Sequence, residues 1–245
     1  AGLLGTPASK VLLTQNSTQG LQLVLQSFLQ EPGDQLITTS HEHGSMNTIA
    51  RHLHESRGVV IREVALEPLN GERIFFEQIK SLITDKTRLV QLSEISCYSG
   101  WRPDLSPLAA YLKERKIPLL VDGAHAIGQG PCRADEFAFY VGSCHKWLGA
   151  PNGTGFLCAD AEGAALLKPL WLSDQFYEPS THPLGRFESQ GTPDVVKWLG
   201  VAAACELQVE LGPVLIAKRQ QELLLILAER IRALPGAKIR TPLAE

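Results

Sequence analysis

The sequence lacks the features that place a protein on nucleic acid or in a membrane. Its 245 residues carry 23 Lys and Arg against 26 Asp and Glu, a net charge of −3, so no basic excess favours a phosphate backbone. No apolar run approaches the roughly 20 residues that span a bilayer. The first five residues lack the basic start and long apolar core of a signal peptide. We therefore expect a cytoplasmic protein with no nucleic-acid or membrane partner.

The sequence also has few cysteines, and no two of them form a CxxC pair. The five cysteines are Cys97, Cys132, Cys144, Cys158 and Cys205. Their scatter argues against a zinc cluster and against a disulfide framework, and it is typical of a reducing compartment. His41-Glu42-His43 resembles a fragment of a metal site, but no Cys or carboxylate partner lies at a matching spacing. We therefore expect no metal.

What is present is an ordinary globular composition, 44% hydrophobic and 20% charged, without an internal repeat or low-complexity linker. Short apolar runs alternate with segments of helical periodicity. The predicted strands are 11–14, 35–39, 59–64, 88–93, 117–121, 138–141 and 153–158. The predicted helices between them are 19–29, 45–57, 75–83 and 105–115. This alternation predicts an α/β fold, a three-layer sandwich whose mainly parallel sheet is covered by helices on both faces.

Two of these strands end in residues that carry chemistry. The run 119–125 delivers an acid, Asp122, and the run 139–147 delivers an amine, Lys146. Functional groups in α/β folds gather at the carboxyl ends of strands. A strand-end acid and a lysine after the next strand suit pyridoxal 5'-phosphate (PLP). The lysine would hold the aldehyde as a Schiff base, and the acid would pair with the pyridinium nitrogen.

A series of motifs then resembles the class V aminotransferase superfamily of fold-type I PLP enzymes. The sequence looks most like the isopenicillin N epimerase branch, which is related to cysteine desulfurases and cystine C–S lyases. The motifs, in order, are Asn16-Ser17-Thr18-Gln19-Gly20, Glu42-His43, Val121-Asp122-Gly123-Ala124-His125, Ser143-Cys144-His145-Lys146-Trp147, Ala150-Pro151-Asn152-Gly153-Thr154-Gly155 and Phe187-Glu188-Ser189-Gln190-Gly191-Thr192. Each motif alone is weak evidence, whereas six in this order are specific.

The resemblance implies how the cofactor phosphate is bound. Ser17 and Thr18 would bind it with hydroxyls and with N–H groups at a helix N-terminus, which is a natural anion site. Ser143 and His145 would complete this phosphate cup. Thr192, with Gly191, matches a motif that reaches the phosphate of the neighbouring subunit, which implies a homodimer with shared active sites.

The resemblance also implies how the cofactor ring is held and used. His43 would stack on the pyridine ring, Asp122 would keep its nitrogen protonated, and Lys146 would form the aldimine. Lys146, His43 and Asp122 are therefore the predicted catalytic residues. His125 stands where cysteine desulfurases usually have Gln, and there it would donate to the phenolic oxygen of the cofactor. Cys144 alternates with the functional side chains beside it, so we expect it to point into the fold.

Three functions remain open. The first is an epimerase or lyase that acts at the α-carbon of a small amino-acid-type substrate. The second is a cysteine desulfurase that supplies sulfur to a partner protein. His125, which replaces the usual Gln, argues against this function. None of the five cysteines matches the catalytic cysteine of the desulfurases, which lies in the C-terminal part of those relatives. The third is a non-catalytic remnant of the PLP fold. Arg186 is present, but no motif assigns it to the substrate carboxylate.

The long segments 196–209 and 213–234 have apolar residues at helical spacing and are predicted to be helices. We expect residues 1–210 to form a large PLP-binding domain that is shortened at its N-terminus. Residues 211–245 would then be a linker helix and the start of a small C-terminal domain that is largely missing. Relatives bind the substrate α-carboxylate with an Arg of that domain, so the resemblance implies that this chain would bind PLP weakly and turn over poorly.

Overall fold

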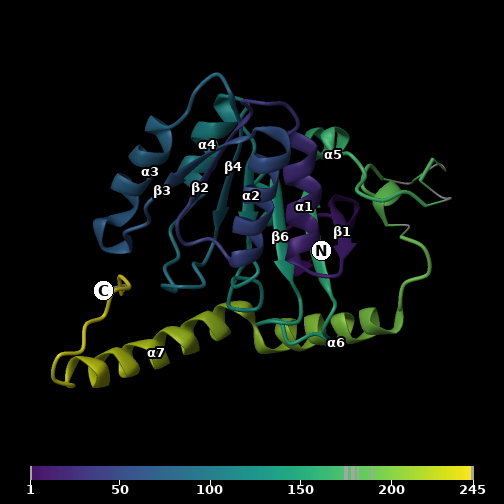
Figure 1. Cartoon of the computed structure of the whole chain (residues 1–245). Helices are drawn as coiled ribbons and strands as arrows, with labels where there is room; N and C mark the ends of the chain where they lie inside the picture. The colour runs from purple at the N-terminus through teal and green to yellow at the C-terminus, as the bar shows by residue number, and fades with distance from the viewer. Residues whose placement is uncertain (1, 174–175, 178–179, 181, 189, 244–245) are drawn as a thin grey trace.

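The computed structural model describes residues 2–173, 176–177, 180, 182–188 and 190–243 (Figure 1). Seven strands form one sheet in the order β1-β7-β6-β5-β4-β2-β3. The strands are β1 (Val11–Thr14), β2 (Gln35–Thr39), β3 (Val60–Val64), β4 (Thr87–Ser93), β5 (Leu119–Asp122), β6 (Phe139–Ser143) and β7 (Gly155–Ala159). The α-helices are α1 (Ser17–Phe28), α2 (Gly44–Arg57), α3 (Gly71–Ser81), α4 (Ser106–Glu114), α5 (Ala161–Leu166), α6 (Val196–Leu211) and α7 (Pro213–Arg232). Short 3-10 turns span Gly2–Leu4, Ala8–Lys10, Pro68–Asn70, Ala134–Glu136 and Gly185–Phe187.

The directions of the strands decide where a site can form. Strands β3, β2, β4, β5 and β6 pair in parallel, whereas β7 is antiparallel to both β6 and β1. Two antiparallel steps restore the direction, so β1 runs the same way as β6. The carboxyl ends of β1, β2, β4, β5 and β6 therefore meet at one edge of the sheet, the usual place for an α/β site.

Two hydrophobic cores, one on each face of the sheet, make the three layers. On one face α1 and α2 bury residues such as Leu21, Val24 and Met46 against Leu120 and Val141. On the other face α3 and α4 bury a second set, which includes Phe75, Ile79, Leu108 and Leu112. Strands β2, β5, β6 and β7 are buried along their whole length, as expected for strands covered on both faces.

Two glycines bring α1 close to the sheet. A Cβ on Gly20 would lie 2.7 Å from the Val141 side chain, so only glycine lets α1 approach β6 this closely. A Cβ on Gly155 would lie 2.6 Å from the Asn16 backbone. These two contacts set the N-terminus of α1 against the carboxyl end of β6.

The structure confirms the predicted α/β sandwich with a mainly parallel sheet. All seven predicted strands and all six predicted helices are present, with ends displaced by a few residues. Helix α3 begins at Gly71 instead of residue 75, because its first residues are largely exposed and carry no apolar period. Helix α5 was not predicted; its six residues are too few for a period, and the Asp160 cap is its main signal.

Helices α6 and α7 run one after the other below the sheet in Figure 1, and α7 projects beyond it. In the described part of the chain, no single helix has the length and apolar character of a membrane span. The pair α6 and α7 passes that test together, by length and composition only, with a 74° bend between the two helices.

Candidate active site

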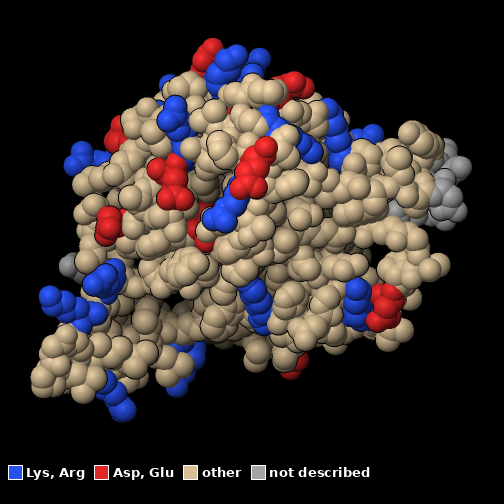
Figure 2. All heavy atoms as spheres, in the orientation of Figure 1, with Lys and Arg blue, Asp and Glu red and all other residues tan. Residues whose placement is uncertain are grey.

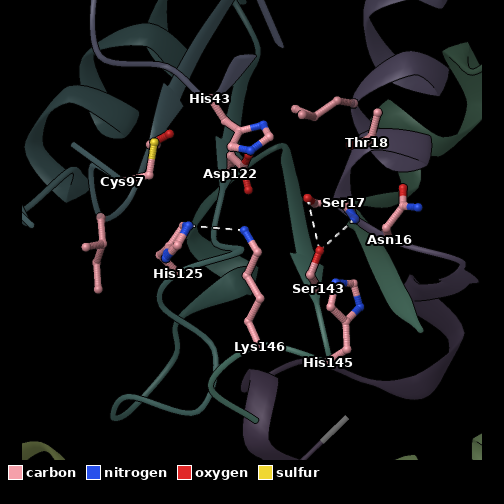
Figure 3. Close-up of a pocket in the computed structure, with 13 residues that line it drawn as sticks. Asn16, Ser17, Thr18, His43, Cys97, Asp122, His125, Ser143, His145 and Lys146 are labelled. Atoms are coloured by element: carbon pink, nitrogen blue, oxygen red, sulfur yellow. Dashed lines mark hydrogen bonds between the residues drawn. The ribbon is translucent and has the colours of Figure 1, made fainter. Parts of the chain in front are cut away.

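A cavity of about 300 Å³ opens at the carboxyl edge of the sheet (Figure 3). It is lined by Asn16, Ser17, Thr18, Leu21, His43, Ser93, Ile95, Cys97, Asp122, His125, Ser143, His145 and Lys146. Eight of the nine predicted site residues lie in this set, and Thr192 does not. Chain segments far apart in sequence converge here because their strands end at the same edge.

One wall of the cavity is built to receive an anion. Asn16 caps α1 by accepting the N–H of Gln19, and Ser17 and Thr18 form the first turn of the helix, which faces the cavity. The N–H of Ser17 donates to Oγ of Ser143 at 3.1 Å, and the hydroxyl of Ser143 donates to Oγ of Ser17 at 3.1 Å. A helix N-terminus with two hydroxyls beside it favours phosphate.

His145 stands next to this anion cup. Its Nδ1 lies 3.1 Å from the carbonyl oxygen of Thr154. A carbonyl can only accept, so Nδ1 carries a proton, and the ring is oriented by the residue that precedes β7.

Asp122 forms the floor of the cavity at the end of β5, and it is only 6% exposed. The N–H of Ala124 donates to its Oδ1 at 2.9 Å. Burial raises the pKa of Asp122, and the Ala124 hydrogen bond and the charge of Lys146 only partly oppose this. A buried carboxyl group of this kind gains most from a cationic N–H partner, and a pyridinium nitrogen supplies one.

Lys146 and His125 face each other across the cavity. Nζ of Lys146 lies 3.1 Å from Nε2 of His125, as the dashed line in Figure 3 marks. Burial lowers the pKa of His125, and the charges of Lys146 and His43 lower it further. His125 is therefore a neutral imidazole beside the lysine amine at neutral pH.

His43 lies above Asp122 in Figure 3, at the mouth of the cavity. It is the N-cap of α2, and its Nδ1 accepts the N–H of Ser45 at 3.1 Å. This bond orients an exposed imidazole ring over the floor. The arrangement suits a flat ring that stacks against His43, with one edge directed at Asp122 (Figure 3).

Some lining residues did not emerge from the sequence. Ser93 is the last residue of β4, and the sequence assigned it no role in the site. Behind it lies Glu42, which is 2% exposed and accepts hydrogen bonds from Thr39, Gln91 and Ser93. The sequence assigned a role to its neighbour His43 but none to Glu42, because a pattern of residue types does not show which side chain is buried.

Other predicted residues lie outside the cavity. Thr192 is exposed, and Gly191 borders a separate hollow with Asn16. Arg186 donates to the carbonyl of Leu167 and lies against the Phe187 ring. The expected inward direction of Cys144 is confirmed, since it is 3% exposed in the core. Among the described residues, no group of three His, Cys, Asp or Glu could hold a metal.

The family model for aminotransferase class V matches residues 1–245, so the chain belongs to the class V aminotransferase family. It is similar to isopenicillin N epimerases of Amycolatopsis lactamdurans (28% identity over 261 residues) and Streptomyces clavuligerus (29% over 267). Both matches cover 99% of this chain and 65% of the relative. A cysteine desulfurase of Serratia proteamaculans (strain 568) is 28% identical over 251 residues, 96% of this chain and 60% of its own length. The chain thus spans about 65% or less of these relatives.

Solved structures support the fold. The cystine C–S lyase C-DES in complex with cysteine persulfide has a TM-score of 0.87 at 22% identity, over 96% of this chain and 65% of that chain. The cysteine desulfurase CsdA from Escherichia coli has a TM-score of 0.85 at 22% identity, over 96% of this chain and 61% of that chain. In a variant of C-DES, glycine is covalently linked to the PLP cofactor. The predicted family and the predicted fold are both confirmed.

Proposed function

We propose that this chain is the cofactor-binding part of a PLP-dependent enzyme that acts at the α-carbon of an amino-acid substrate, as an epimerase or a C–S lyase. The observation that carries the proposal is the convergence of an amine, a buried acid and an anion cup on one cavity. Lys146, Asp122 and the pair Ser17 and Ser143 line the same space of about 300 Å³. PLP has an aldehyde, a basic ring nitrogen and a phosphate, which match these three groups.

Bound PLP supplies an electron-withdrawing ring that stabilises negative charge at a substrate α-carbon. Asp122 would keep a proton on the ring nitrogen, and His43 would stack on the ring. Ser17, Thr18, Ser143 and His145 would hold the phosphate. Lys146 would supply the amine for the aldehyde, and the same amine is placed to act as the base for the substrate α-proton.

The desulfurase function is the second candidate, because cysteine desulfurases are among the relatives. It needs a reactive thiolate at the substrate sulfur. Among the described residues, Cys97 is the cysteine that lines the cavity. Burial, followed by the nearby Glu42 carboxyl group, raises the pKa of Cys97, so it stays a thiol at neutral pH. Cys97 is therefore a poor candidate for that thiolate.

The homodimer remains part of the proposal. Thr192 is exposed and lies outside the cavity of its own chain. A residue placed this way is available to the phosphate cup of a neighbouring copy. The complete lysine, acid and anion cup support an active site rather than a non-catalytic remnant of the fold.

The first experiment incubates the purified chain with PLP, reduces it with borohydride and maps the labelled peptide. We expect the label on Lys146, and its loss in Lys146→Ala but not in the control Lys197→Ala. With the label established, release of cysteine persulfide from cystine and exchange of the α-proton for deuterium separate a lyase from an epimerase. Lys146→Ala should slow either reaction about 100-fold or more, the usual contribution of a positioned acid–base group. A label on another lysine would contradict the proposal.

A further inference from the structure

His125 lies between side-chain nitrogen atoms of two adjacent residues, Lys146 and Trp147. The indole Nε1–H of Trp147 donates to Nδ1 of His125 at 3.3 Å, and Nζ of Lys146 lies 3.1 Å from Nε2 on the other side of the ring. Lys146 is half-buried in the cavity, whereas the Trp147 side chain is 51% exposed at its rim. One imidazole therefore connects the reacting amine to a surface tryptophan.

The chemistry of the indole decides which nitrogen of His125 carries the proton. An indole N–H can only donate, so Nδ1 must present its lone pair. Because burial lowers the pKa of His125, the ring is neutral and holds a single proton at neutral pH. That proton lies on Nε2, and Nε2–H points at Nζ of Lys146.

We propose that Trp147 is a positioning residue that fixes the tautomer of His125 and thereby directs Nε2–H at the reacting atoms on Lys146. An N–H that faces Nζ would be satisfied by the lone pair of the amine, whereas an ammonium there would compete with the indole for the same imidazole. The amine is the form of lysine that adds to an aldehyde, so this tautomer would orient Lys146 for reaction with PLP. The effect on Lys146 rests on the proposed function, because it concerns the reaction with PLP. The tautomer itself does not, because it is a property of the cofactor-free chain.

Both ends of this connection are fixed by the fold. The carbonyl of Trp147 accepts a hydrogen bond from Nε2 of Gln208 at 3.4 Å, and the next residue, Leu148, is 5% exposed in the core. On the other side, the side-chain amide of Gln129 donates to the carbonyl of His125. The contact between Trp147 and His125 thus joins two anchored backbone segments.

The experiment compares Trp147→Phe with Trp198→Phe, a control that makes the same change on α6. Nitrogen chemical shifts of the imidazole rings, assigned by the loss of one signal in His125→Gln, report the tautomer in the cofactor-free chain. We expect a bare Nδ1 and a protonated Nε2 in the wild type and in Trp198→Phe. Trp147→Phe should show a mixture of both tautomers, because the Phe ring keeps the apolar surface but has no donor.

The second measurement is the rate at which PLP becomes covalently attached at neutral pH, trapped with borohydride at increasing times. Loss of one neutral hydrogen bond predicts attachment about threefold to tenfold slower in Trp147→Phe, with no change in Trp198→Phe. If Trp147→Phe does not fold, slow solvent exchange of the Trp147 indole proton in the wild type tests the same hydrogen bond.

A proton on Nδ1 in the wild type, rapid exchange of that indole proton, or an unchanged tautomer in Trp147→Phe would overturn the inference. So would an unchanged attachment rate in a variant whose tautomer has shifted. If the wild type shows the expected tautomer but never attaches PLP, the proposed function fails while the role of Trp147 in the tautomer stands.

Discussion

At the scale of the residue, the site places two buried carboxyl groups close together. Asp122 forms the cavity floor, and Glu42 lies behind the wall made by Ser93. Burial raises the pKa of both groups, and for Glu42 the charge of Asp122 adds to the effect. When ionised, such buried groups lower the stability of the cofactor-free protein. A cation at the position of the ring nitrogen offsets this cost for Asp122.

The first prediction concerns Asp122→Asn without cofactor. A raised folded-state pKa means that the folded chain binds the proton more tightly than the unfolded chain, so stability falls as pH rises through that pKa. The variant removes this loss, and each unit of pKa difference is worth about 1.4 kcal/mol at neutral pH. Urea unfolding at several pH values should therefore show a more stable variant and a flatter pH dependence, with a remaining slope from Glu42.

With PLP added, the order should reverse, because the amide cannot hold the ring-nitrogen proton as a carboxylate does. Wild type should gain more stability from the cofactor than Asp122→Asn does. An Asp122→Asn variant less stable than wild type at neutral pH without cofactor would contradict the burial argument.

At the scale of the element, the site depends on how β2 is tied to β4. Their backbones pair in parallel only near the start of β2, with a register shift between Gln35 and Leu36. Beyond the other end of β2, the side chain of Glu42 connects the two segments instead. It accepts hydrogen bonds from the hydroxyl of Ser93 at 2.7 Å and from the side-chain amide of Gln91 at 3.0 Å. Because Glu42 immediately precedes His43, this side-chain contact holds the ring of His43 over the cavity.

The second prediction compares Glu42→Ala with Gln35→Ala. Gln35 is a matched control, because its side chain joins the same two strands at their far end through Thr87 and also donates to the carbonyl of Leu82. Each change leaves buried donors or acceptors unpaired and should cost about 2–3 kcal/mol of stability. Only Glu42→Ala should also weaken PLP binding, on the order of tenfold, as loss of an outer support does.

Stability comes from chemical denaturation and affinity from titration with PLP. Equal weakening of PLP binding in the two variants would mean that Glu42 acts only through general stability.

At the scale of the whole molecule, α6 and α7 present a large apolar surface. Exposed apolar residues include Val196, Leu199, Leu207, Val209 and Leu215, with exposed fractions between 52% and 72%. Along the bottom of Figure 2 this region is largely uncharged, with scattered charged side chains of both signs. Patches of this kind usually mark contact surfaces, which agrees with the proposed homodimer.

The third prediction is that Leu199→Lys weakens self-association of the chain. Leu199 is 72% exposed on α6, and a charge there would be buried without a partner in a dimer. Sedimentation over a range of concentrations should show a dimer dissociation constant raised about tenfold or more. Leu69→Lys is the control, because Leu69 is 66% exposed but lies in the 3-10 turn Pro68–Asn70. A wild-type chain that stays monomeric, or equal effects of both changes, would contradict the prediction.

The sequence by itself determined the strand ends and most of the groups that line the cavity. Asp122 and Lys146 were predicted because each follows an apolar run that ends in a functional residue. Such a pattern can be recognised from neighbouring residues alone. Asn16-Ser17-Thr18 marked a helix start for the same reason, since a capping residue acts within its own turn.

Only the tertiary structure decided the contacts between distant segments. Ser17 meets Ser143 across 126 positions of sequence, and Glu42 is buried against Ser93. Such contacts depend on strand order and register, which no local pattern contains. The same holds for Trp147, because its indole N–H finds a hydrogen-bond partner only when the fold brings His125 beside it. Local propensity places each group at a strand end, and the sheet decides which groups become neighbours.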